Sequence, residues 1–212
     1  IHIAVEAFRR AYADRNYWLG DTDFVDVPLD RLTSEAYADS LRASIAMDSA
    51  SDSETFNRVP LLEGTHTTHF SIVDAAGNAV AVTTTLNGGF GSGVTVRGAG
   101  FVLNNEMDDF TSQVGTPNMY GLVQGEANAI APGKRMLSAM TPTVVINPEG
   151  RTELVTGTPG GSTIITTVFQ IVSNHIDFHV PAQTSVDAPR FHPVSYTHLR
   201  AHETVLDLVC RL

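Results

Sequence analysis

Thr67 is the residue whose type and position offer the clearest chemistry in this sequence. It stands in a Thr-His-Thr-Thr-His segment, where a stretch rich in Ser, Asp and Glu meets a β-branched one. A threonine hydroxyl is a weak nucleophile in mid-chain, but at a chain terminus the residue's own α-amine can take the hydroxyl proton. Such a junction is accessible to cleavage, and the strand that follows would hold the new terminus. Taken alone, however, Thr67 and Thr68 are explained more simply as β-branched residues that begin a strand.

The elements before Thr67 are predicted to be helical. Residues 1 to about 46 contain large side chains at gaps of three to five, as an amphipathic helix requires: Val5, Phe8, Tyr12 and Tyr17. Thr33 and Ser34 are candidate caps for a second helix, after a turn-rich acidic segment at residues 20–23. Residues 47–66 have no periodicity and are rich in Ser, Asp and Glu, which predicts a flexible linker.

The elements after Thr67 are predicted to be hairpins and a helix. Alternating and β-branched runs separated by turn residues predict two hairpins, residues 68–73 with 79–85 and residues 143–146 with 154–158. Pro159-Gly160-Gly161-Ser162 then leads into an apolar helix from about Ile164 to Ile176. Hairpins that alternate with buried helices predict a layered α+β domain.

Long motifs in a fixed order resemble γ-glutamyltransferases over nearly all of residues 1–192. The start of that family's small subunit is similar to Thr67-Thr68-His69-Phe70-Ser71-Ile72-Val73-Asp74. The resemblance continues through Thr85-Leu86-Asn87, Leu103-Asn104-Asn105-Glu106-Met107-Asp108-Asp109-Phe110, Lys134-Arg135-Met136-Leu137-Ser138-Ala139-Met140-Thr141-Pro142 and Gly157-Thr158-Pro159-Gly160-Gly161-Ser162. The end of its large subunit is similar to Ala11-Tyr12-Ala13-Asp14-Arg15 and Leu19-Gly20-Asp21.

The resemblance implies an αββα sandwich of the N-terminal-nucleophile hydrolase type, here truncated at both ends. It implies a precursor that cleaves itself between His66 and Thr67 into a large and a small subunit. Thr67 then attacks the γ-carbonyl of glutathione or another γ-glutamyl compound and forms a γ-glutamyl-threonine acyl-enzyme. Water, an amino acid or a peptide accepts the glutamyl group, and no metal or organic cofactor takes part. A periplasmic or secreted location is expected from the family.

The resemblance also assigns roles close to the nucleophile. Thr85 would return on the adjacent strand and orient the hydroxyl of Thr67. Gly160 and Gly161 match the oxyanion hole, where the absence of a Cβ lets two successive N–H groups approach the developing negative charge. Tyr120 matches a residue of a lid loop, although by itself it is an ordinary exposed loop tyrosine.

Five further positions match the residues that bind the substrate's α-amino-acid end. Asn87, Glu106 and Asp109 would gather the α-ammonium, because carboxylates and an amide carbonyl accept hydrogen bonds from a cation. Ser138 would bind the α-carboxylate, and Ala139 stands where the family commonly has a second serine, so only its backbone amide remains. Glutamine is common in relatives at the position of Glu106. Without the resemblance, acidic loop residues are usually just solvated.

Composition excludes several classes of partner and site. The formal net charge of −10 argues against nucleic acid or an anionic membrane surface, because both attract a basic face. No apolar stretch approaches the roughly 20 residues that span a bilayer. The single cysteine, Cys210, excludes an internal disulfide and a cysteine-based zinc site. His175 and His179 are expected at a helix end and not in a metal site.

The end of the sequence is expected to be non-native. Residues 194–204 resemble the translation of a transposase adapter used in sequencing libraries, and residues 208–212 resemble its outer end. The predicted organisation is therefore 1–46 (large-subunit helices), 47–66 (linker), 67–193 (incomplete catalytic region) and 194–212 (tail). Because most of the large subunit would be missing, including an arginine that binds the substrate carboxylate in the family, this chain by itself is predicted neither to mature nor to turn over substrate.

Three functions compete for the parent protein. The first is γ-glutamyl transfer or hydrolysis. The second is a glutaryl acylase of the cephalosporin acylase kind on the same scaffold, and the third is a non-enzymatic relative that retains a binding cleft. Asn87, Glu106 and Asp109 favour the first, because a glutaryl group has no α-ammonium, and the Thr67, Thr85 and Gly160-Gly161 set weighs against the third.

Overall fold

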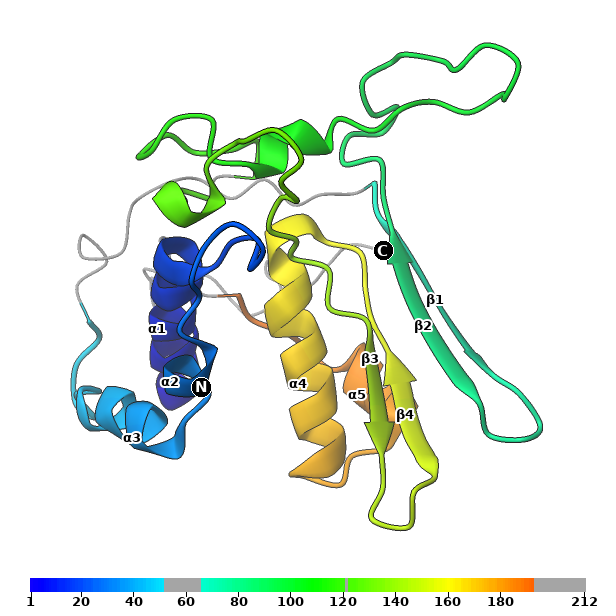
Figure 1. Cartoon of the computed structure of the whole chain (residues 1–212). Coiled ribbons are helices and arrows are strands. Elements are labelled where there is room, and N and C mark those ends of the chain that lie inside the picture. The colour runs from blue at the N-terminus through cyan, green and yellow to red at the C-terminus, as the bar shows by residue number, and fades with distance from the viewer. Residues whose placement is uncertain (52–65, 121, 193–212) are drawn as a thin grey trace. The chain divides into compact units, whose positions relative to one another are not determined.

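The computed structural model describes residues 1–51, 66–120 and 122–192 (Figure 1). These residues fall into two compact units: unit 1 comprises 1–51, 107–120 and 122–138, and unit 2 comprises 66–106 and 139–192. Residues 107–120 and 122–138, which belong to the predicted catalytic region, group with the N-terminal helices in unit 1. Most of the predicted linker and all of the predicted tail lie outside the described residues.

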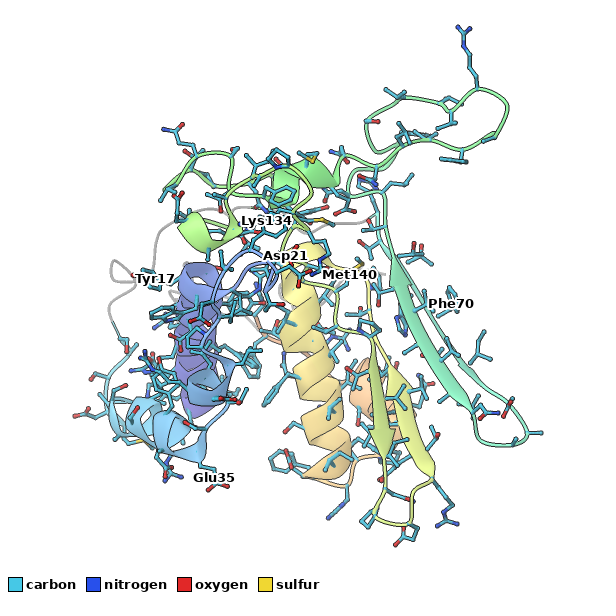
Figure 2. The ribbon with its side chains drawn as sticks, in the orientation of Figure 1. Tyr17, Asp21, Glu35, Phe70, Lys134 and Met140 are labelled. Carbon is cyan, nitrogen blue, oxygen red and sulfur yellow. The ribbon has the colours of Figure 1, made fainter. Side chains whose placement is uncertain are left out.

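Unit 1 is built on three helices, α1 (His2–Trp18), α2 (Leu29–Leu32) and α3 (Glu35–Ala43). The side chain of Ser34 accepts a hydrogen bond from the Tyr37 N–H at 3.2 Å, so one of the two predicted capping residues caps α3. The apolar face predicted for the first helix is partly wrong. Phe8 and Tyr12 are buried, but Tyr17 is 66% exposed and points away from the ribbon in Figure 2.

A buried carboxylate replaces the expected apolar contact on the first turns of α1. Glu6 is 1% exposed; its Oε1 lies 2.9 Å from Arg9 Nη1 and its Oε2 lies 2.7 Å from Arg10 Nη1. The backbone N–H and the hydroxyl of Ser51 donate to the same carboxylate. Burial raises the pKa of Glu6, but the hydrogen bonds from Ser51 and Arg10 outweigh this and lower the pKa to about 2. This cluster fastens residue 51 to α1.

Unit 2 contains both predicted hairpins and the predicted apolar helix. The strands are β1 (Thr68–Val73), β2 (Ala79–Thr84), β3 (Thr143–Ile146) and β4 (Thr152–Thr156), and the helices are α4 (Ile164–Ile176) and α5 (Ala182–Asp187). The bounds of α4 are as predicted, whereas β4 begins and ends two residues before the predicted strand 154–158. Each hairpin is antiparallel, as the turn residues between its strands indicate.

The two hairpins of unit 2 form separate two-stranded sheets that touch through side chains. Ser71 Oγ donates to the carbonyl of Val155 at 3.3 Å, and Thr152 Oγ1 donates to the carbonyl of Gly77 at 2.9 Å. Figure 1 shows α4 alongside β3 and β4, and His175 on α4 lies 3.5 Å from Glu153 on β4. The fold of the described residues is therefore mixed helix and sheet.

The β1–β2 hairpin exposes an apolar surface. Three large side chains on one face of the hairpin are between 45% and 54% exposed: Phe70, Ile72 and Val80. Figure 2 shows Phe70 directed away from the hairpin. An apolar sheet surface of this kind is typical of a contact face. Among the helices in the described part of the chain, none is both long and apolar enough to cross a membrane.

Candidate active site

The register of the first hairpin brings Thr67 and Thr85 together. Thr68 pairs with Thr84 in the antiparallel ladder, so the residues one step beyond, Thr67 and Thr85, face each other across the open end of the hairpin. The hydroxyl of Thr67 donates to Thr85 Oγ1 at 3.2 Å. The spacing of 18 residues between the two threonines is thus the spacing that this hairpin requires. The role predicted for Thr85, orienting the Thr67 hydroxyl, stays a prediction, but the contact it needs is present.

The loop after β2 holds Thr85 and Asn87 in place. Thr85 Oγ1 also accepts the backbone N–H of Asn87 at 2.9 Å. Asn87 is 2% exposed and has a φ of 70°, a left-handed conformation that asparagine tolerates better than most residues. Asn87 Nδ2 donates to the carbonyl of Asn105 at 3.3 Å, and Asn105 Oδ1 accepts the Gly88 N–H at 2.8 Å. Asn105 therefore ties this loop to the chain next to Glu106.

The residue before the predicted cleavage bond is packed against the same loop. A Cβ built on Gly89 would lie 3.2 Å from the ring of His66, closer than most side chains approach. The missing side chain at Gly89 thus lets the imidazole lie against the backbone. Thr67 itself is half-buried. The His66–Thr67 peptide therefore stands at the end of an ordered hairpin and beside an ordered loop.

Gly160 and Gly161 open the 3₁₀ turn that leads into α4. Gly160 has a φ of 137° and Gly161 a φ of 57°, conformations that favour glycine. A Cβ on Gly160 would lie 2.5 Å from Thr163 Oγ1. Because the N–H groups at the start of a helix have no intrahelical acceptor, this turn is suited to receive an oxyanion. The predicted oxyanion role stays a prediction.

The predicted recognition residues are divided between the two units. Asn87, Glu106 and Ala139 belong to unit 2 with Thr67, whereas Asp109, Tyr120 and Ser138 belong to unit 1. Glu106 and Asp109 were expected in a loop, but they lie at the two ends of a 3₁₀ turn, Glu106–Asp109. Glu106 is 9% exposed, so it is not an ordinary solvated acid.

Tyr120 differs from its expected exposed state. It is 7% exposed, and two other apolar residues of unit 1, Phe110 and Leu122, are 5% exposed. The Tyr120 N–H donates to Asn118 Oδ1 at 3.0 Å. Tyr120 is therefore part of the core of unit 1. Ser138, by contrast, has an exposed side chain.

Sequence reasoning assigned no role to three residues that organise the candidate site. Asn105 fixes the loop of Asn87, and Asn128 Oδ1 accepts the N–H of Leu137 at 3.0 Å, one residue before Ser138. Arg15 Nη2 donates to the carbonyl of Ser138 at 3.3 Å. A signal for Arg15 was present, because it follows Phe8 and Tyr12 at helical spacing, and a charge on an apolar helix face indicates a buried polar contact.

In the described ranges no three His, Cys, Asp or Glu side chains gather closely enough to hold a metal ion. His175, in the last turn of α4, makes a hydrogen bond through Nδ1 with the carbonyl of Val180 at 2.9 Å. His179 follows the helix with a φ of 55°. The two histidines therefore lie at a helix end, as predicted.

A family model described as gamma-glutamyltranspeptidase matches residues 1–207. The chain belongs to the gamma-glutamyltranspeptidase family. A glutathione hydrolase proenzyme of Pseudomonas sp. (strain A14) is 55% identical over 193 residues, which are 91% of this chain and 33% of that protein. The gamma-glutamyltranspeptidase from Pseudomonas nitroreducens complexed with L-DON is 58% identical, with a TM-score of 0.56 over 59% of this chain and 64% of that one.

A second kind of relative is more distant. An acylase, the ACY 1 proenzyme of Pseudomonas sp. (strain V22), is 38% identical over 190 residues, which are 90% of this chain and 32% of that protein. The chain spans about a third of the length of these curated relatives. The gamma-glutamyltranspeptidase family match therefore covers the candidate site but not the whole of such a protein.

Proposed function

We propose that the full-length protein transfers or hydrolyses γ-glutamyl groups of glutathione and related compounds through an acyl-enzyme on Thr67. The observation that carries this proposal is the Thr67–Thr85 hydroxyl contact at 3.2 Å, at the open end of a hairpin whose register sets it. Membership of the gamma-glutamyltranspeptidase family supports reading this contact as a nucleophile, Thr67, and the residue that orients it, Thr85. The αββα sandwich and a periplasmic or secreted location are further parts of the proposal.

Maturation would begin with attack of Thr67 Oγ1 on the carbonyl carbon of His66. The hydroxyl proton is transferred to the departing nitrogen, the His66–Thr67 C–N bond breaks, and an ester forms between His66 and Thr67 Oγ1 as the α-amine of Thr67 is released. Water then hydrolyses the ester and leaves one chain ending at His66 and another beginning at Thr67. The ordered surroundings of this peptide support the step, because a fixed nucleophile and carbonyl lower its entropic cost.

Catalysis would reuse the same hydroxyl with a new base. The free α-amine of Thr67 takes the proton from Oγ1 as the oxygen attacks the γ-carbonyl of the substrate. The N–H groups of Gly160 and Gly161 would stabilise the oxyanion. Collapse of the tetrahedral intermediate expels the amine, which takes the proton, and leaves the γ-glutamyl ester. Water or an acceptor amine then attacks that ester and restores the Thr67 hydroxyl.

Substrate choice would depend on the charged α-amino-acid end. Asn87, Glu106 and Asp109 provide acceptors for an α-ammonium, and Ser138 with the amide of Ala139 provides donors for an α-carboxylate. A glutaryl acylase is the second candidate, since an acylase is also similar to this chain. Asn87, Glu106 and Asp109 together favour the γ-glutamyl substrate, because a glutaryl group has no α-ammonium for these acceptors to bind.

The test compares γ-glutamyl and glutaryl p-nitroanilides with the full-length protein. We expect kcat/KM for the γ-glutamyl compound to exceed that for the glutaryl compound by at least about 100-fold, because the missing ammonium leaves polar acceptors without a partner. Thr67→Ala serves as the inactive control for both substrates. Equal or better turnover of the glutaryl compound would assign the protein to the acylases.

A further inference from the structure

Arg15 on α1 contacts one of the residues that the proposed function uses for recognition. Its side chain lies inside unit 1, with 8% of the residue exposed. Arg15 Nη2 donates to the carbonyl of Ser138 at 3.3 Å, so the Ser138 carbonyl is turned toward the buried guanidinium while the Ser138 side chain is exposed. Burial lowers the pKa of Arg15, and the nearby charges of Tyr12 and Asp109 oppose that effect. The hydrogen bond to Ser138 is the contact that connects Arg15 to the recognition residues.

Asp21 makes a second attachment to the same segment. The side chain of Asp21 is 1% exposed, and its carboxylate accepts the backbone N–H of Arg135 at 2.8 Å. It also accepts Arg135 Nε at 3.0 Å and Nη2 at 2.6 Å, a contact between residues 114 positions apart. These hydrogen bonds from Arg135 hold the pKa of Asp21 well below its usual range. The pair thus fixes both the backbone and the side chain of Arg135.

Two more contacts complete the attachment of residues 134–138. Lys134 Nζ donates to the carbonyls of Ala127 and Ala129 at 2.8 and 2.9 Å, and the Leu137 N–H donates to Asn128 Oδ1. Figure 2 shows Asp21, on the loop after α1, close to Lys134. The backbone N–H groups of Arg135 and Leu137 are therefore held by the side chains of Asp21 and Asn128.

We propose that Arg15 and Asp21 are positioning residues that set the carboxylate-binding segment 135–138, so that recognition by one cleavage product depends on side chains of the other. This rests on the proposed function for the identity of the ligand. Arg15 and Asp21 precede the His66–Thr67 bond, whereas their partners Ser138 and Arg135 follow it. After cleavage these two contacts, the Arg15 clamp on Ser138 and the Asp21 clamp on Arg135, would join the two chains within unit 1. Loss of either clamp would weaken substrate binding and leave the position of Thr67 unchanged.

A buried charged clamp suits this task for a physical reason. A guanidinium has a planar set of donors in a fixed geometry, so its partners are confined in direction as well as in distance. A buried charge whose partner is removed is costly, so the segment has little freedom to settle elsewhere. Small displacements of substrate-positioning groups lower productive binding strongly.

The experiment uses the full-length protein with Arg15→Gln and Asp21→Asn as the test variants. We expect KM for γ-glutamyl p-nitroanilide to rise roughly tenfold or more in each, as expected for loss of a hydrogen bond to a charged group. We expect kcat to stay within about threefold, because the lost interaction serves binding. Amide hydrogen exchange of residues 135–138 should become at least about tenfold faster, because the segment opens more readily.

Arg9→Gln is the matched control, because it removes a buried guanidinium from the same helix, where Arg9 pairs with Glu6. Arg15→Lys tests geometry, since it keeps the charge but loses the planar donor set. We expect Arg9→Gln to lower the melting temperature without the rise in KM, and Arg15→Lys to give an intermediate KM. Unchanged KM and unchanged exchange in Arg15→Gln and Asp21→Asn would overturn the clamp.

The same experiment separates the clamp from the proposed function. A wild-type protein that matures but does not turn over the γ-glutamyl anilide would contradict the proposed function alone. In that case the exchange of residues 135–138 still decides the positioning of the segment: faster exchange in the two variants supports the clamp, and wild-type exchange refutes it.

Discussion

The two units place their candidate site residues by different means. In unit 2 a backbone ladder sets Thr67 against Thr85, and hydroxyl and amide contacts hold the loop that follows. In unit 1 buried charged side chains hold the chain: Arg15 donates a hydrogen bond to the carbonyl of Ser138, and Asp21 accepts hydrogen bonds from Arg135. The first arrangement depends on strand register, and the second depends on buried charged side chains that bind backbone groups: Arg15 binds the Ser138 carbonyl and Asp21 binds the Arg135 N–H.

This difference separates the hydroxyls of the nucleophile from the charged contacts of unit 1. Hydroxyls at the end of a hairpin can be exchanged with little effect on folding, so substitutions of Thr67 and Thr85 should act mainly on kcat. Substitution of a buried charged residue lowers the stability of the fold, because its partner is left buried without a hydrogen-bonding group. Substitutions at the clamps of unit 1 should therefore act on stability and on KM together.

The largest effect is expected at Thr67. Thr67→Ala in the full-length protein should prevent cleavage and lower kcat by at least about 10⁴-fold, because both steps need its hydroxyl. Gel electrophoresis and the anilide assay measure the two effects. Thr67→Ser keeps a hydroxyl and is expected to cleave and to retain measurable turnover. Cleavage at the wild-type rate in Thr67→Ala would place the nucleophile elsewhere.

The next effect is expected at Gly160. Gly160→Ala forces a Cβ into a φ of 137° and to 2.5 Å from Thr163 Oγ1, which displaces the predicted oxyanion donors. We expect kcat to fall by a factor equivalent to about 2.7–4 kcal/mol. Gly150→Ala is the control, because its φ of 78° carries similar backbone strain but nothing lies within 4 Å of a new Cβ. Equal kcat in the two variants would remove Gly160 from the oxyanion hole.

Acid is expected to loosen unit 2 before unit 1. Burial lowers the pKa of His192 to about 4 from 6.5, so the unfolded chain binds more protons between these values. The stability contribution of a neutral His192 is complete above pH 6.5 and is lost as the pH falls through 4, an effect of at most about 3 kcal/mol. The pKa of Glu6, about 2 against 4.5, gives a contribution that is complete above pH 4.5 and lost as the pH falls through 2.

Hydrogen exchange of α4 and α1 between pH 7 and 3, corrected for intrinsic rates, measures this order. Protection of α4 should decline first, because the His192 ring makes a hydrogen bond with Thr166 Oγ1 on that helix at 2.7 Å. His192→Gln should remove the loss between pH 6.5 and 4. Simultaneous loss of protection in both helices would contradict the expected order, in which unit 2 loses protection at a higher pH than unit 1.

A smaller effect is expected at Asp109. Asp109→Asn removes an acceptor charge for the substrate ammonium and should raise KM by a factor equivalent to about 1.5–3 kcal/mol, with kcat nearly unchanged. Asp108→Asn is the matched control, because the Asp108 carboxylate accepts the Met119 N–H at 2.9 Å. A larger rise in KM for Asp108→Asn than for Asp109→Asn would exchange their roles.

Local patterns in the sequence predicted the local structure. The turn residues between β-branched runs gave both hairpins, and the apolar run from Ile164 to Ile176 gave α4. The Thr67–Thr85 contact was predictable as well, because an antiparallel hairpin fixes which residues face each other. The Ser34 cap followed from the preference of serine for the first turn of a helix.

Contacts between distant residues were not predictable in the same way. Residues 107–138 are joined to the N-terminal segment by pairs such as Asp21 and Arg135, which are 114 positions apart. Sequence periodicity carries no information about contacts at such a separation. The burial of Tyr120 and the exposure of Tyr17 have the same cause, since both depend on what the rest of unit 1 covers. Periodicity predicts that a helix has an apolar face but not which charged residues are buried with it.

Peptide mapping of the protein by mass spectrometry, after acid quenching during turnover of a γ-glutamyl compound, is the most direct test of Thr67 as the nucleophile. We predict a new chain that begins at Thr67 and carries a γ-glutamyl group on the Thr67 oxygen, with neither cleavage nor adduct in Thr67→Ala. An uncleaved chain that still turns over substrate, or a glutamyl group on another residue, would contradict this assignment.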